Sequence, residues 1–214
     1  MKPKHKIISF LAVLLLFSVE PLLAQAIDED LASKLEDLGA YELLELGYQY
    51  NSGDGVELSE EKAFIVFKAS LEKGEMRANY ALGNAYADGL GTDVDYEKAV
   101  EHYKIAAEAG VGAAQINYGW MHSMGRGVPV NYDVTFKWYQ IAANRGIAHG
   151  QYLLGRLYYE GQGTPVDMEK AKYWVGEAAS KGHSTAQQVL SRLNAFDQDY
   201  DSTLADQFPL PPGY

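Results

Sequence analysis

A 36-residue repeat is the feature of this sequence that most restricts how the chain can fold. Glycines recur in three sets, and within each set the spacing is 36 residues without insertion or deletion. A fixed period in the range of about 20–50 residues is typical of stacked structural units rather than of one globular core. The sets are Gly47, Gly83, Gly119 and Gly155; Gly74, Gly110, Gly146 and Gly182; and the pairs Gly53/Gly55, Gly89/Gly91, Gly125/Gly127 and Gly161/Gly163.

Each unit of the repeat predicts a hairpin of two helices. In the second unit the first helix is expected from about Arg77 to Ala87, where apolar residues recur at helical spacing. Gly89 and Gly91 end that helix, because glycine adopts the positive φ that a helix end or a tight turn requires. All four units then carry a residue suited to cap a second helix, at Ser59, Asp95, Asn131 and Asp167.

The repeat resembles the Sel1-like family, which comprises α/α relatives of the tetratricopeptide repeats. The resemblance rests on the pattern LG-x-x-Y-x-x-G-x-G, then D-x-x-KA, then an AA-x-x-G ending. In the second unit these residues are Leu82-Gly83, Tyr86, Gly89, Gly91, Asp95, Lys98-Ala99, Ala106-Ala107 and Gly110. The third unit departs from it with His122 in place of tyrosine and Val134-Thr135 in place of Lys-Ala, and the first has Ser70-Leu71 in place of Ala-Ala.

The resemblance covers about Ala40 to Leu193. It implies an all-α, right-handed α/α solenoid of four Sel1-like hairpins with terminal capping helices. It also implies a non-enzymatic scaffold, because such repeats serve mainly as adaptors in protein complexes. We expect a signal peptide at 1–26, an N-terminal capping helix at 27–39, repeats at 40–75, 76–111, 112–147 and 148–183, a C-terminal capping helix at 184–196, and an acidic, proline-rich disordered tail at 197–214.

The first 26 residues are expected to form a cleavable secretory signal peptide. Three lysines precede a 13-residue apolar run from Ile7 to Val19, and Ala24-Gln25-Ala26 is a small-x-small cleavage site. The run is shorter than the ~20 residues of a membrane span, so an uncleaved signal anchor is the less favoured alternative. We therefore expect a periplasmic or secreted protein with no membrane span after cleavage.

Charge and cysteine content limit the partners and the sources of stability. Without residues 1–26, 15 basic and 28 acidic residues remain, a net charge of −13. Such acidity argues against binding to nucleic acid or to an anionic membrane surface. The sequence contains no cysteine, so stability must come from packing between repeats rather than from disulfides.

No residue pattern indicates catalysis, a cofactor or a metal site. The histidines at 102, 122, 149 and 183 fit no HExxH motif, and no nucleophile elbow or phosphate-binding loop occurs. His122 stands at a tyrosine position of the repeat and is expected to be a packed or hydrogen-bonded side chain. A calcium loop beginning at Asp197 is an alternative, but Ser202 and Phe208 replace the required glycine and glutamate. A solvated acidic tail is favoured there.

The first helices of the hairpins are expected to line a concave binding surface. The surface is expected at three positions of each first helix, which lie three residues before, one residue after and four residues after the repeat glycine. These positions share a face of the helix outside the core, and their residue types differ between units. They include aromatic residues and an arginine, which are enriched at binding hot spots. The predicted protein-binding residues are Tyr48, Tyr80, Asn84, Trp120, Tyr152, Arg156 and Tyr159. Packing between neighbouring first helices is the alternative role of these side chains.

The leading functional hypothesis is an exported scaffold that binds another protein or an extended peptide through this surface. One alternative is an assembly factor for an envelope polymer or exopolysaccharide, or a glycan-binding module, because aromatic rings beside asparagine and arginine can stack on sugars. A hydrolase is the weakest hypothesis, since the sequence shows no nucleophile–base pair.

Overall fold

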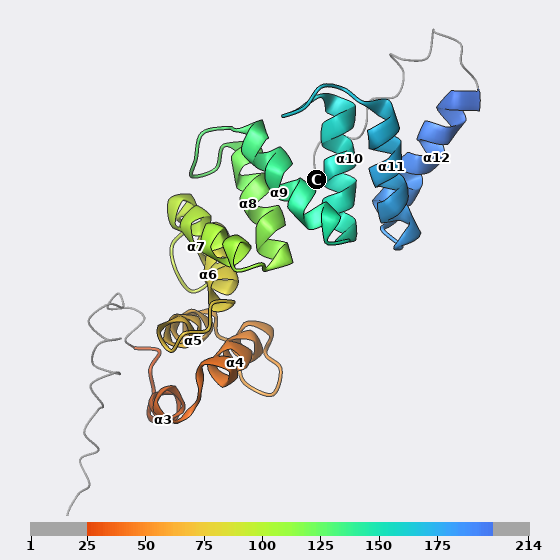
Figure 1. Ribbon diagram of the computed structural model, residues 1–214. Helices are drawn as coiled ribbons and strands as arrows, with labels where there is room; N and C mark the ends of the chain where they lie inside the picture. Colours follow the sequence, from red (N-terminus) through yellow and green to blue (C-terminus); the bar gives the residue numbers. More distant parts are fainter. Residues whose placement is uncertain (1–24, 199–214) are drawn as a thin grey trace, which may run out of the picture. The chain divides into compact units, whose positions relative to one another are not determined.

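The computed structural model describes residues 25–198, with side chains as far as Leu193. This part of the chain contains ten α-helices and no strand (Figure 1). The helices are α3 (Glu29–Asp37), α4 (Ala40–Ser52), α5 (Glu60–Glu72), α6 (Ala78–Asp88), α7 (Tyr96–Glu108), α8 (Gly112–Met124), α9 (Tyr132–Asn144), α10 (Ala148–Glu160), α11 (Met168–Ser180) and α12 (Ser184–Gln198). The predicted all-α class of helical hairpins is confirmed.

The helices belong to two compact units. The first unit extends to Ala114 and includes Arg126–Val128, and the second comprises Gln115–Gly125 and the chain from Pro129 onward. In the first unit, α4 packs on α5 and α6 packs on α7, and α5 contacts α6. In the second unit, α10 packs between α9 and α11, and α11 also contacts α12. Helices that follow one another in sequence therefore pack on one another within each unit.

The second helix of every hairpin begins at the predicted capping residue. The side chains of Ser59, Asp95, Asn131 and Asp167 each accept a hydrogen bond from a backbone N–H in the first turn. The backbone N–H of the same four residues donates to a carbonyl near the end of the first helix, at Tyr50, Tyr86, His122 and Tyr158, over 2.8–3.0 Å. One residue thus starts the second helix and also ties it to the first.

The glycine within each first helix allows its partner helix to approach closely. A Cβ at Gly83 would lie 2.5 Å from the Tyr103 ring, and one at Gly119 would lie 2.7 Å from the Tyr139 ring. Both rings are almost fully buried, so they have little room to move. Close packing is therefore the reason for glycine at this position of the repeat.

The second glycine of each loop makes a different contact, with the preceding repeat. In the first unit, a Cβ at Gly91 would overlap the backbone carbonyl of Glu60, the first residue of α5. A Cβ at Gly163 would overlap the carbonyl of Tyr132, the first residue of α9, in the second unit. Gly55 occupies the same place in the first repeat, and a Cβ there would meet no atom within 4 Å. Gly91 and Gly163 therefore set the spacing between consecutive repeats.

The two predicted capping helices are present. On α3, Leu31 and Leu35 are buried in the core of the first unit, and Asp28 caps the helix by accepting from the backbone of Leu31. On α12, Ala186, Val189 and Leu193 pack against buried residues of α11. Each terminal helix covers apolar surface of the neighbouring repeat, which is the role expected of a solenoid cap.

Replacing Gly91 and Gly55 with alanine separates the spacing role from the conformational one. Both residues have positive φ, +73° at Gly55 and +68° at Gly91, so alanine at either place costs about 1–2 kcal/mol. Gly91→Ala also overlaps the Glu60 backbone, and we expect a further loss of about 1–3 kcal/mol in the free energy of unfolding. Urea denaturation measures both. Equal losses would contradict the spacing role.

Candidate functional site

A hollow of about 470 Å³ lies between α10 and α12. Pockets that hold small ligands or side chains of a partner are commonly about 300–1,000 Å³ in volume. We call this hollow the α10–α12 groove. Its lining residues are His149, Tyr152, Arg156, His183, Thr185, Gln188, Val189 and Arg192.

The repeat register places these side chains opposite one another. Tyr152 and Arg156 are one turn apart on α10, so they share a face of that helix. Gln188 and Arg192 on α12 follow them by 36 residues each. The capping helix α12 therefore presents residues at the same repeat positions as α10. Val189, which is buried, also lines the groove.

Three nearly parallel rings line one part of the groove. The centroids of Tyr152 and His183 are 4.9 Å apart, and those of His149 and His183 are 5.4 Å apart. The backbone N–H of Ala186 donates to Nδ1 of His183, so the hydrogen of the neutral ring is on Nε2. That Nε2 lies 3.1 Å from Nδ1 of His149 and donates to it. The two histidines bond to each other across the groove and also secure the start of α12.

The permanent positive charge of the groove comes from its two arginines. Burial lowers the pKa of His149, and the neighbouring His183 lowers it further; burial also lowers the pKa of His183. Both rings are therefore mainly neutral at pH 7. Burial raises the pKa of Tyr152, against the influence of Arg156, so this phenol is neutral too. Nε of Arg156 lies 3.1 Å from a carboxylate oxygen of Glu160, one turn along α10.

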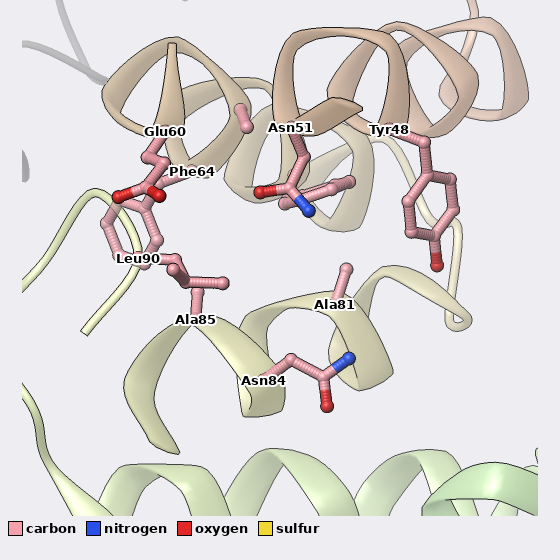
Figure 2. Close-up of a pocket in the computed structure, with 10 residues that line it drawn as sticks. Tyr48, Asn51, Glu60, Phe64, Ala81, Asn84, Ala85 and Leu90 are labelled. Carbon is pink, nitrogen blue, oxygen red and sulfur yellow. The ribbon is translucent and has the colours of Figure 1, made fainter. Parts of the chain in front are cut away.

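In the first unit, Tyr48 and Asn84 line a much smaller cavity, of about 30 Å³ (Figure 2). Figure 2 shows Tyr48 and Asn51 on α4, with Ala81 and Ala85 on α6. A water molecule needs about 10–15 Å³ on this measure, so the cavity has room for roughly two. Asn84 already accepts a hydrogen bond of 2.8 Å from the Tyr103 hydroxyl. This cavity is too small for a side chain of a partner.

The remaining predicted residues have mixed surroundings. Tyr80 is half-buried, with its ring 6.2 Å from that of Tyr103, and Tyr159 packs against core residues of the second unit. Trp120 is half-buried on α8, where its carbonyl accepts a hydrogen bond from Ser123. Of the seven predicted binding residues, Tyr152 and Arg156 line the α10–α12 groove, and Tyr48 and Asn84 line the small cavity.

One expectation about the first-helix positions is wrong. The position three before the repeat glycine was expected to lie outside the core, yet Leu44 and Ile116 are buried members of the two cores. An aliphatic side chain at this position gains more by joining the core, whereas the larger and more polar Tyr80 and Tyr152 stay half-exposed.

Six lining residues were not predicted from the sequence: His149, His183, Thr185, Gln188, Val189 and Arg192. The 36-residue period was the available signal for two of them, because it carries Tyr152 to Gln188 and Arg156 to Arg192. The two histidines are not related by this period. His149 and His183 are 34 residues apart, and their contact depends on how α12 packs.

Comparison with known proteins agrees with this architecture. The Sel1 repeat family matches residues 43–74, 77–111, 112–147 and 148–183, well over half of the chain. The chain belongs to the Sel1 repeat family. No curated protein sequence matches it.

Two solved Sel1 repeat structures are similar. One is the crystal structure of c5321, a protective antigen present in uropathogenic Escherichia coli strains that displays an SLR fold, at 35% identity and a TM-score of 0.74. The match covers 80% of this chain and 37% of c5321. The other is a Sel1 repeat protein from Oxalobacter formigenes, at 32% identity and a TM-score of 0.66, covering 76% and 48% of the two chains. This chain spans less than half the length of either relative.

Two further findings concern the described residues alone. Between residues 25 and 198, no helix has the length and apolar character needed to cross a membrane. In the same range, no group of three or more histidine, cysteine, aspartate or glutamate side chains is arranged to hold a metal ion. The favoured acidic tail, and the alternative calcium loop that would begin at Asp197, lie mostly outside the described residues.

The third Sel1 repeat departs from the others at two positions that contact each other elsewhere. In the other three repeats a lysine lies over the tyrosine ring, with Lys62 over Tyr50, Lys98 over Tyr86 and Lys170 over Tyr158, at 5.1–5.7 Å. His122 and Val134 replace both members of this cation–π pair. His122 packs edge-on against Tyr118, and its buried ring nitrogens make no hydrogen bond. The two substitutions therefore belong together.

His122 should make the protein less stable in acid. Burial lowers its pKa, and the nearby Pro129 carbonyl opposes the shift without forming a well-aligned hydrogen bond. The unfolded chain therefore takes up a proton near pH 6.5 that the folded chain resists. The stability contribution is complete above about pH 6.5 and is lost as the pH falls toward the lower folded pKa.

We expect His122→Tyr to flatten the pH dependence of the free energy of unfolding between pH 7.5 and 5.5. One proton changes the free energy of unfolding by at most about 1.4 kcal/mol per pH unit. Three other histidines with lowered pKa, at 102, 149 and 183, keep part of the dependence in both proteins. Urea melts at both pH values measure the difference. Identical slopes for the two proteins would contradict this role of His122.

Proposed function

We propose that this Sel1 repeat protein is an exported, non-enzymatic scaffold that binds an extended segment of another protein in the α10–α12 groove. The observation that supports this most is the groove itself, which combines a half-exposed tyrosine with two arginines on packed helices. Tyrosine and arginine are residue types that dominate the energetics of protein interfaces. Rigid helices also hold these side chains in place before a partner arrives, which lowers the entropic cost of binding.

Binding is a better use of this groove than hydrolysis. A hydrolase needs a base beside a nucleophile and a third group that orients the base. Here the base candidates His149 and His183 bond to each other, and His183 also accepts from the backbone of Ala186. The imidazole pair is thus committed to positioning α12. A sugar ring stacked on Tyr152 is the alternative ligand that the following experiment distinguishes.

Arg156→Gln should weaken capture of the partner at least tenfold, because a groove arginine that meets a carboxylate or carbonyl is a typical hot spot. Its folded-state role is one ion pair with Glu160, so the loss of stability should stay below about 0.5 kcal/mol. The measurement is affinity capture from a periplasmic extract, followed by mass spectrometry and titration of the captured protein.

Lys137→Gln is the matched control, since Lys137 is an exposed cation on α9 that does not line the groove. It should capture the partner as well as the parent does. Equal capture by the parent and Arg156→Gln would exclude the groove as the binding site. Retention of a glycan instead of a protein would favour the sugar-binding alternative.

The export part of the proposal is tested separately. Residues 1–24 lie outside the described residues, and the proposal rests on the basic, apolar and small-x-small pattern of the first 26 residues. We expect mature protein from the native host to begin at Ile27 and to appear in the periplasmic or secreted fraction. N-terminal sequencing decides this, and an intact Met1 form in the membrane fraction would refute it.

A further inference from the structure

The α10–α12 groove is cationic in a strongly acidic protein. Its lining residues include Arg156 and Arg192 and no carboxylate. Without residues 1–26, the chain has a net charge of −13. Among the described residues, Glu160 lies beside Arg156, while Arg192 has no acidic partner. Arg156 is half-buried and Arg192 is exposed, and a guanidinium group in such a place attracts carboxylates in preference to other groups.

An acidic segment of the same chain follows this groove in the sequence. Residues 197–214 begin five positions after Arg192 and contain no lysine, arginine or histidine. Four aspartates lie in this segment, at positions 197, 199, 201 and 206. Its charge is therefore complementary to that of the groove. We propose that residues 199–214, which follow α12, dock in the α10–α12 groove through their aspartates and compete there with the partner.

The chain is long enough for this contact. Residues 199–214 span up to about 50 Å when extended. Arg192 lies six residues before Gln198, the last residue of α12, which is about 9 Å along the helix. The segment can therefore turn back to the groove and still leave most of its length free.

A weak contact is sufficient for this docking, because the segment belongs to the same chain as the groove. A segment joined to its site by a short linker has an effective concentration of about a millimolar. A contact with a dissociation constant near that value would be occupied about half of the time. When the protein is at micromolar concentration, the segment of a second copy is present at about one thousandth of that effective concentration. Docking within one chain is therefore favoured over exchange between copies.

The test compares amide NMR spectra of the mature chain, residues 27–214, with those of a variant in which all four aspartates are asparagine. We expect chemical-shift differences concentrated at residues 149–156 and 185–192. Changing the same four residues to glutamate keeps the charge and should leave the parental spectrum nearly unchanged. In 1 M salt the parental and asparagine spectra should converge, because ion pairs at an exposed site are screened.

A synthetic peptide of residues 197–214 provides the reverse experiment. Added at millimolar concentration to the asparagine variant, it should shift the groove resonances toward their parental positions. Adding Arg156→Gln and Arg192→Gln to that variant should reduce its affinity for the peptide at least tenfold. The proposal is overturned if the groove resonances do not differ between parent and asparagine variant. It is also overturned if their difference grows with protein concentration, which would indicate exchange between copies.

Failure of this proposal is distinguishable from failure of the proposed function. The spectra concern only the chain and its own peptide, whereas the function depends on capture of another protein. If the segment docks, the asparagine variant should bind the captured partner several-fold more tightly than the parent. If the segment does not dock, both should capture it equally.

Discussion

Close approach between a glycine and a neighbouring helix is the constraint on which the rest of this structure depends. In each first helix, glycine lets a side chain of the partner helix press against the backbone, as Tyr103 does at Gly83. In the loops, Gly91 and Gly163 bring a backbone segment onto the first residue of an earlier helix. Both kinds of contact involve backbone atoms. They therefore set the position of each helix independently of the side chains on its exposed face.

That independence explains how a regular stack carries an irregular surface. The glycines and the capping positions recur in every repeat, while the first-helix positions outside the core differ between repeats and include tyrosine, asparagine, tryptophan and arginine. The consequence is clearest at α12, which has Ser191 at the glycine position but keeps the register of the repeat. Because α12 packs on α11 and also lines the groove, it serves both as a cap and as one wall of the groove.

The repeat made most of the fold predictable from the sequence. Period, capping residues and glycine positions gave the hairpins and both terminal helices, since each of these signals acts over a few neighbouring residues. The reason for the second loop glycine was less visible. Positive φ explains Gly55 and Gly91 equally, but only Gly91 faces the backbone of a preceding helix. That difference depends on what packs against the loop, which a local pattern does not contain.

The groove was predictable only in part, for the same reason. Tyr152 and Arg156 followed from helical spacing, whereas the histidine pair depends on how the start of α12 meets α10. Helical spacing also could not distinguish exposed positions from core positions. Leu44 and Ile116 were therefore expected outside the core, although both are buried in it. Burial is decided by the neighbouring helix, not by the helix on which the residue lies.

Site-specific photo-crosslinking tests most directly whether the α10–α12 groove is where a partner binds. A photoreactive phenylalanine derivative in place of Gln188 would stand in the groove, on an exposed position of α12. The same derivative in place of Tyr173, which is 59% exposed on α11, would stand outside it. After irradiation in the native host, a scaffold that uses the groove gives a crosslinked protein from position 188 and none from position 173. Crosslinks from position 173 alone would contradict it.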